Sequence, residues 1–120
     1  MLVDDNADVR FLIRAITEDA GGDVVVAGDA GSCDEALERV DAVDPDVVVL
    51  DAMLPVHDGF TTAARIRERR PQQLILLCSA VVDDATRERA ATAGITACLS
   101  KDAFEAIPGT ALELVRQRDA

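Results

Sequence analysis

The chain alternates five times between short apolar runs and segments with helical periodicity. The clearest apolar runs, at 47–50 and 74–77, are continuous and do not alternate with polar residues. Strands of this kind are buried on both faces, as in a parallel sheet with helices on each side. The pattern therefore predicts a doubly wound α/β fold, whose ligands bind at the carboxyl ends of the strands.

The boundaries of the elements follow from periodicity and from Gly, Pro and capping residues. The first run, Met1 to Val3, is short for a central strand, so we expect a first strand that is shortened at its start. Residues 102–107 are expected to form a loop or a single turn. The predicted strands cover 1–3, 23–28, 45–51, 73–80 and 95–101, and the predicted helices cover 7–22, 32–43, 59–70, 83–94 and 108–118.

Composition narrows the possible functions. The 120 residues carry a net charge of −11, which disfavours binding to nucleic acid or to an anionic membrane surface. The three cysteines, Cys33, Cys78 and Cys98, have no CxxC spacing, and no export signal or apolar span is present. We therefore expect one cytoplasmic domain over residues 1–120, with no output domain in this chain.

Polar residues gather where the predicted strands end. Carboxylates brought together at one edge of a sheet repel each other, which favours a bound cation, and hard oxygen ligands suit Mg²⁺. Lys101 is the only lysine in the chain, the other eleven basic residues being arginine. The strand-end residues are Asp4 and Asp5 after the first strand, Asp51 at the third, Ser79 and Ala80 at the fourth, and Lys101 at the fifth.

Four motifs together resemble the response-regulator receiver domain of two-component signalling. They are "LVDDN" at 2–6, "LDAMLPVHDG" at 50–59, "LLCSA" at 76–80 and "LSKD" at 99–102. The resemblance covers nearly the whole chain and implies a flavodoxin-like sheet of strand order 2-1-3-4-5. Asp102 after the lysine is similar to receivers of LuxR/NarL-type transcription regulators, so the resemblance favours a transcriptional output.

The resemblance also implies roles for individual residues. Asp51 would accept a phosphoryl group from a sensor histidine kinase, making the domain a switch and not a turnover enzyme. Lys101, Ser79 and the Ala80 N–H would bind the phosphoryl oxygens. Cys98 stands where many relatives have an aromatic switch residue, so a large ring reorientation is not expected there. Mg²⁺ or Mn²⁺ would be held by Asp4, Asp5, Asp51 and the backbone carbonyl of Met53.

Other readings stay open at this point. The chain could be a stand-alone or degenerate receiver that serves only as a docking module. A haloacid-dehalogenase-like phosphatase also places a nucleophilic Asp after a strand, but it needs an acid where Met53 stands. No G-x-G-x-x-G or Walker pattern supports nucleotide binding. A homodimer through the face formed by 83–94, 95–101 and 108–118 is a further expectation from the resemblance.

Overall fold

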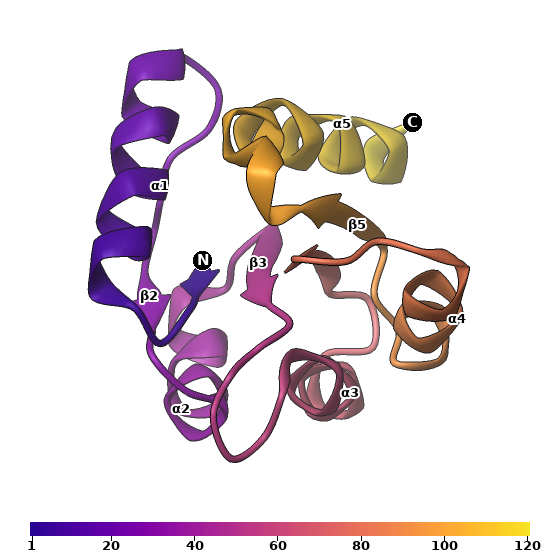
Figure 1. Cartoon of the computed structure of the whole chain (residues 1–120). Coiled ribbons are helices and arrows are strands. Elements are labelled where there is room, and N and C mark those ends of the chain that lie inside the picture. Colours follow the sequence, from indigo (N-terminus) through magenta and orange to yellow (C-terminus); the bar gives the residue numbers. More distant parts are fainter.

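A sheet of five parallel strands lies at the centre of the computed structural model, which describes residues 1–120 (Figure 1). The strand order is β2-β1-β3-β4-β5, so the predicted doubly wound, flavodoxin-like topology is confirmed. The fold places the carboxyl ends of all five strands along one edge. The strands are β1 (Leu2–Val3), β2 (Asp29–Ala30), β3 (Val47–Asp51), β4 (Leu74–Ser79) and β5 (Ala97–Ser100).

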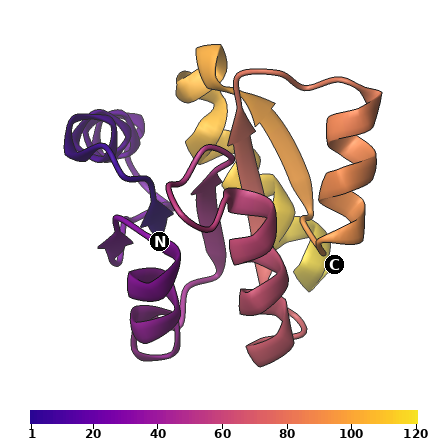
Figure 2. The ribbon, with the colours of Figure 1, turned by 60° about the horizontal axis from the view of Figure 1, so that its bottom comes forward.

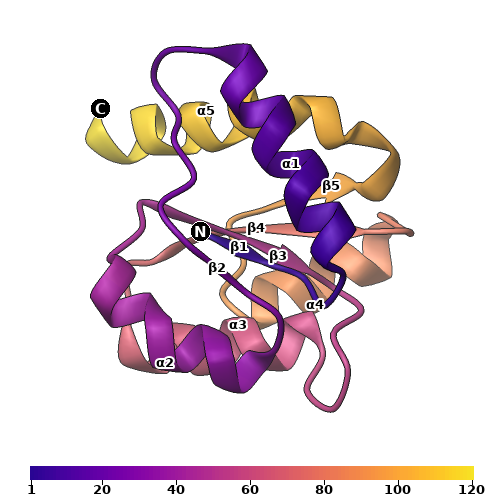
Figure 3. The same ribbon diagram turned by 90° about the vertical axis from the view of Figure 1, so that its left-hand side faces the viewer.

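Helices cover both faces of the sheet. Figure 3 shows α1 (Ala7–Ala20) and α5 (Ile107–Asp119) on one face, opposite α2 (Cys33–Val43) and α3 (Gly59–Arg69). Helix α4 (Asp84–Thr92) also lies on the α3 side, as Figure 2 shows. A 3₁₀ turn, Lys101–Ala106, joins β5 to α5 where the sequence predicted a loop or a turn.

Short polar side chains begin four of the helices. Each one accepts a hydrogen bond from a backbone N–H of the first turn, which would otherwise lack a partner. Ser32, for example, is the first residue of the predicted helix 32–43, and it accepts from the Glu35 N–H at 3.2 Å. The capping residues are Asn6 for α1, Ser32 for α2, Asp58 for α3 and Asp83 for α4.

The core consists of two aliphatic layers, one on each side of the sheet. Along β3, Val48 and Leu50 pack toward α2 and α3, whereas Val47 and Val49 pack toward α1 and α5. Every residue of β3 is buried, which explains why its sequence shows no alternation of polar and apolar residues. The central strands are therefore held rigidly from both faces.

The second strand differs from its prediction. Residues 23–28 were expected to form it, but the structure pairs only Asp29 and Ala30 with β1. Strand β1 itself contains two residues, so the predicted shortening is confirmed. The valine-rich segment before Asp29 lies beyond Met1 and has no strand beside it to pair with. A strand needs a partner as well as a suitable composition.

Helix α4 is the least anchored of the five helices. Ala90 is its only buried residue, because the helix offers the core small alanine side chains. Few buried methylene groups give little hydrophobic stabilisation. No helix of the protein combines the length and the apolar character needed to cross a bilayer.

Candidate functional site

The predicted strand-end residues meet at the carboxyl edge of the sheet. Val3 of β1 pairs in register with Leu50 of β3, so Asp4 follows β1 beside Asp51. The Lys101 ammonium, just after β5, lies 2.8 Å from Oδ1 of Asp51. The same oxygen accepts a hydrogen bond from the Met53 N–H at 3.0 Å. The ends of β1, β3 and β5 thus bring the carboxylates of Asp4 and Asp51 and the ammonium of Lys101 together.

Three carboxylates form a cluster at this edge. One oxygen each from Asp4, Asp5 and Asp51 lies within 4.8 Å of the others. Asp4 and Asp51 are buried, at 8% and 5% exposure, whereas Asp5 is exposed. Asp4 is fixed in place by the Asn6 N–H, which donates to its Oδ1 at 2.9 Å. The cluster is therefore preorganised and open to solvent on the side of Asp5.

Burial and the neighbouring charges shift the pKa values of the groups in and around the cluster. Burial raises the pKa of Asp4, and the neighbouring charge of Asp51 adds to that rise, against the lowering effect of the Asn6 hydrogen bond. Burial alone would lower the pKa of Lys101, but its hydrogen bond to Asp51 and the carboxylates around it raise that pKa instead. Burial, followed by the charges of Asp51 and Asp4, raises the pKa of Cys78 to about 12, so its thiol stays protonated.

The donor set fits a divalent cation. Three carboxylates face a single ammonium, so negative charge remains in excess at a partly buried edge. The available atoms are hard oxygens, as Mg²⁺ and Mn²⁺ prefer, and the exposure of Asp5 leaves room for water ligands. No histidine or cysteine belongs to the cluster, which disfavours a zinc site.

The remaining predicted residues lie around this cluster at different depths. Ser79 is buried at the end of β4, and its hydroxyl oxygen accepts from the Val81 N–H at 3.3 Å, which leaves the hydroxyl proton free to donate. Ala80 is exposed in the loop that follows. Met53, two residues after Asp51, has a side chain that is 71% exposed. Cys98 lies half-buried on β5 and packs against the core on the α3 side.

The loop after Asp51 depends on one glycine. The Gly59 N–H donates to the Ala52 carbonyl at 3.0 Å, and a Cβ on Gly59 would lie 2.8 Å from the Ala52 Cα. Helix α3 can therefore begin directly against the end of β3 only without a side chain at this position. Val56, at the tip of the loop, has a φ of 67°, which is strained for a β-branched residue.

An arginine joins α4 to the start of α3. The Arg89 guanidinium lies 2.8 Å from Oδ2 of Asp58 and 4.1 Å from the centre of the Phe60 ring. Asp58 also caps α3 by accepting from the Thr61 N–H at 2.9 Å. Stacking and charge together join the thinly packed α4 to the start of α3, at the end of the loop that follows Asp51.

Sequence reasoning placed Gly59 in the motif at 50–59 without its packing role, and it did not single out Arg89. The close approach at Gly59 depends on the distance between α3 and β3, which the sequence pattern does not give. The contact of Arg89 needs the orientation of α4 relative to α3, and one arginine among eleven carries no such signal.

Known proteins share this sequence and arrangement. The chemotaxis protein CheY of Listeria monocytogenes is 35% identical over 81 residues, which cover 68% of this chain and 66% of that protein. A protein-glutamate methylesterase/protein-glutamine glutaminase of Methanosarcina mazei is 28% identical over all 120 residues. This chain spans 29% of the length of that methylesterase.

Solved structures agree with these relatives. The receiver domain of a response regulator NarL from Mycobacterium tuberculosis superposes with a TM-score of 0.86 at 30% identity, covering 96% of this chain and 93% of that one. The response regulator domain of Thermotoga maritima CheB gives a TM-score of 0.81 at 26% identity, covering 97% and 91%. Residues 1–107 match the family model of the response regulator receiver domain. With its sheet order and its carboxylate cluster, the chain belongs to the receiver domains of two-component signalling.

Proposed function

We propose that the domain is a phosphorylation switch in which Asp51 accepts a phosphoryl group from the phosphohistidine of a sensor histidine kinase. The observation that supports this most is the contact of 2.8 Å between Lys101 and Asp51 inside a cluster of three carboxylates. A nucleophile held on a buried strand needs little reorganisation before it reacts. The exposed side of the cluster leaves a path for an incoming phosphohistidine.

The reaction consists of one substitution at phosphorus. A carboxylate oxygen of Asp51 forms a bond to phosphorus while the bond between phosphorus and the histidine nitrogen breaks. The electron pair of the broken bond returns to the imidazole. Lys101, which donates to Asp51 before the reaction, then donates to a phosphoryl oxygen, and the Ser79 hydroxyl and the Ala80 N–H donate to others.

We assign Asp4, Asp5, Asp51 and the Met53 carbonyl as the residues that would hold Mg²⁺ or Mn²⁺. When bound, the cation offsets the negative charge that would otherwise repel the phosphoryl donor. Contacts within the chain hold these carboxylates in position: the Asn6 N–H donates to Asp4, and the Met53 N–H and the Lys101 ammonium donate to Asp51.

Substitution of Asp51 tests this proposal directly. Incubation with acetyl phosphate and Mg²⁺ is expected to add one phosphoryl group, seen in the intact mass, and Asp51→Asn is expected to abolish it. Asp34→Asn is a matched control, because Asp34 is exposed in the first turn of α2 and far in sequence from the cluster. Undiminished labelling of the Asp51→Asn protein would refute the proposal, and turnover of a phosphatase substrate would favour the dehalogenase-like alternative.

Transmission of the signal has to work without an aromatic residue at Cys98. We infer that it runs through the Ser79 loop to α4, whose link to the Asp51 loop is the contact of Arg89 with Asp58 and Phe60. Because α4 buries so little, a small change in that loop is enough to shift it.

The output is proposed from likeness alone. The similarity to the NarL receiver supports a transcriptional output, and the similarities to CheY and CheB support a chemotaxis-type output. The three free cysteines accord with a reducing cytoplasm. Light scattering with and without beryllofluoride distinguishes the two: a dimer through α4, β5 and α5 favours transcription, and a persistent monomer favours the CheY type.

A further inference from the structure

Three arginines gather around one carboxylate of β2. The Arg10 Nε and the Arg14 Nη2 each lie 3.4 Å from Oδ2 of Asp29. The Arg39 Nη1 lies 3.9 Å from the other oxygen of the same carboxylate. Arg10 and Arg14 come from α1 and Arg39 from α2, and these helices cover opposite faces of the sheet (Figure 3). Asp29 therefore joins both helices to β2, the strand that pairs with β1.

Arg10 differs from the other two arginines in its second contact. Its Nη1 donates to the backbone carbonyl of Asp4, and its side chain is only 22% exposed. Arg14 donates instead to the Val26 carbonyl at 3.4 Å, and Arg39 donates to the Asp29 carbonyl at 2.8 Å. Those two carbonyls belong to β2 and to the segment before it. Of the three arginines, only Arg10 contacts the backbone that carries the carboxylate cluster.

The carbonyl that Arg10 holds belongs to the peptide between Asp4 and Asp5. The Asp4 N–H donates to the Ala30 carbonyl at 3.1 Å, so the chain is also fixed just before this peptide. The Asp5 side chain is exposed and forms no hydrogen bond or ion pair within the chain. Its direction is therefore set by its backbone. Because a peptide unit is planar, fixing its carbonyl oxygen also fixes the path of the chain into Asp5.

We propose that Arg10 is a positioning residue, which holds the Asp4–Asp5 peptide so that both carboxylates stay turned toward Asp51. This inference rests on the proposed function, in which those carboxylates hold Mg²⁺ or Mn²⁺. The planar guanidinium makes its two contacts through different nitrogens, Nε to Asp29 and Nη1 to the carbonyl. A single ammonium nitrogen cannot reproduce that fork.

The charge of Arg10 makes the direction of the effect informative. A guanidinium close to the cluster repels an incoming cation, so by charge alone its removal would tighten cation binding. Positioning predicts the opposite. Arg10→Gln is expected to weaken Mn²⁺ binding by about tenfold, as loss of a group that orients metal ligands does. Arg10→Lys keeps the charge but not the fork, so it is expected to recover only part of that affinity.

The EPR signal of unbound Mn²⁺ measures the affinity, at a temperature where each protein is folded. Arg14→Gln is the matched control, because it removes an arginine from the same Asp29 carboxylate and leaves the Asp4 carbonyl bonded. Its Mn²⁺ affinity is expected to equal that of the natural chain. The ¹⁵N heteronuclear NOE of the Asp5 amide is expected to fall in Arg10→Gln and to stay unchanged in Arg14→Gln. A merely structural role would lower the Tm and leave both readouts unchanged.

Two outcomes would overturn the inference, and they differ in what else they affect. Equal or tighter Mn²⁺ binding by Arg10→Gln would overturn the inference alone, because labelling of Asp51 by acetyl phosphate tests the proposed function separately. Absence of Mn²⁺ binding by the natural chain would overturn both this inference and the assignment of the cation site.

Discussion

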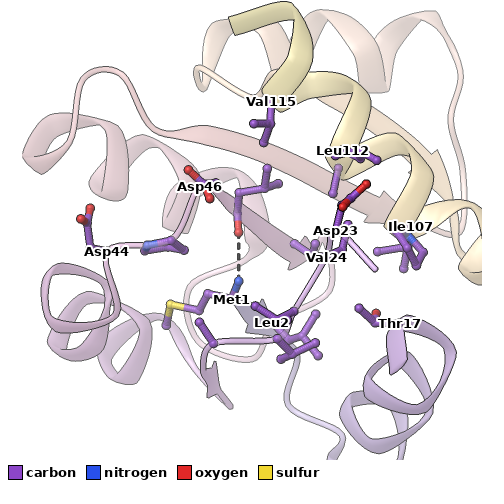
Figure 4. Close-up of a pocket in the computed structure, with 18 residues that line it drawn as sticks. Met1, Leu2, Thr17, Asp23, Val24, Asp44, Asp46, Ile107, Leu112 and Val115 are labelled. Carbon is purple, nitrogen blue, oxygen red and sulfur yellow. Dashed lines mark hydrogen bonds between the residues drawn. The ribbon is translucent and has the colours of Figure 1, made fainter. Parts of the chain in front are cut away.

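At their carboxyl ends the strands hold Asp51 and Lys101 2.8 Å apart, whereas at its amino end β1 stops beside a cavity of about 210 Å³. At the carboxyl end three carboxylates lie close enough to repel one another. The Lys101 ammonium and the N–H groups of Asn6 and Met53 donate hydrogen bonds to two of them. At the amino end the cavity is lined mostly by aliphatic side chains, together with Asp23, Asp44, Asp46 and the Met1 residue whose amino group is buried (Figure 4). Chemistry is thus concentrated at one end of the sheet, and the packing is incomplete at the other.

The amino end is not uniformly open. At β3 and β4 the buried Gln73 side chain donates to the carbonyls of Pro45 and Asp46, at 3.1 and 3.2 Å. No such group closes the end of β1. The β3–β4 pair next to the site has five residue pairs in register, whereas β1 pairs with each of its neighbours over only two.

The largest expected effect is at the carboxyl end, where Gly59→Ala would place a Cβ 2.8 Å from the Ala52 Cα. Because backbone and not a flexible side chain is in the way, we expect a loss of about 3 kcal/mol in unfolding free energy. Gly109→Ala is the control, since nothing lies within 4 Å of its Cβ position, and it should gain about 0.5 kcal/mol. Urea unfolding measures both. Similar values for the two variants would show that α3 does not press against β3.

The next largest effect is the pH dependence of stability that arises from the buried amino group of Met1. Burial, with help from Arg14 and against Asp46, lowers the pKa of the Met1 amino group from 8.0 to about 6. Between these values the unfolded chain keeps a proton that the folded chain has lost, so stability should rise by about 2 kcal/mol from pH 6 to pH 8. An acetylated amino terminus is the control, because it removes only the titration of the Met1 amino group. Parallel pH profiles for both chains would contradict the buried amine.

The smallest expected effect is the loss of folding stability caused by the buried carboxylate of Asp4. Burial and the charge of Asp51 raise the pKa of Asp4, which means that its ionised form destabilises the folded state at neutral pH. Asp4→Asn removes that charge and keeps the acceptor for the Asn6 N–H, so we expect a gain of about 1 kcal/mol in EDTA. Added Mg²⁺ should stabilise the natural chain more than this variant. A loss of stability in EDTA would mean that Asp4 is held favourably without a cation.

Sequence patterns predicted the elements where local and global preferences agree. The runs that became β3 and β4 are apolar throughout, and Ser32 and Asp58 stand where helices begin. The prediction was wrong for 23–28, whose valines favour a strand that lacks a neighbour to pair with. Pairing is a property of two segments, so one segment cannot reveal it.

The site shows the same difference between what one segment of the sequence encodes and what depends on two segments packing together. The convergence of Asp4, Asp51 and Lys101 followed from strand ends, because parallel strands share one edge. The contact of Arg89 with Phe60 joins two helices on the same face, and its geometry depends on the tilt of α4. No spacing along the chain encodes that tilt.

Lys101 has one more consequence, because it is the only lysine in the chain. A protein grown with ¹⁵N-labelled lysine carries isotope at one residue, and that residue touches Asp51. Its side-chain resonance would follow the arrival of a phosphoryl group or a cation without overlap from any other signal. The composition of the chain thus supplies a spectroscopic reporter at the reacting carboxylate.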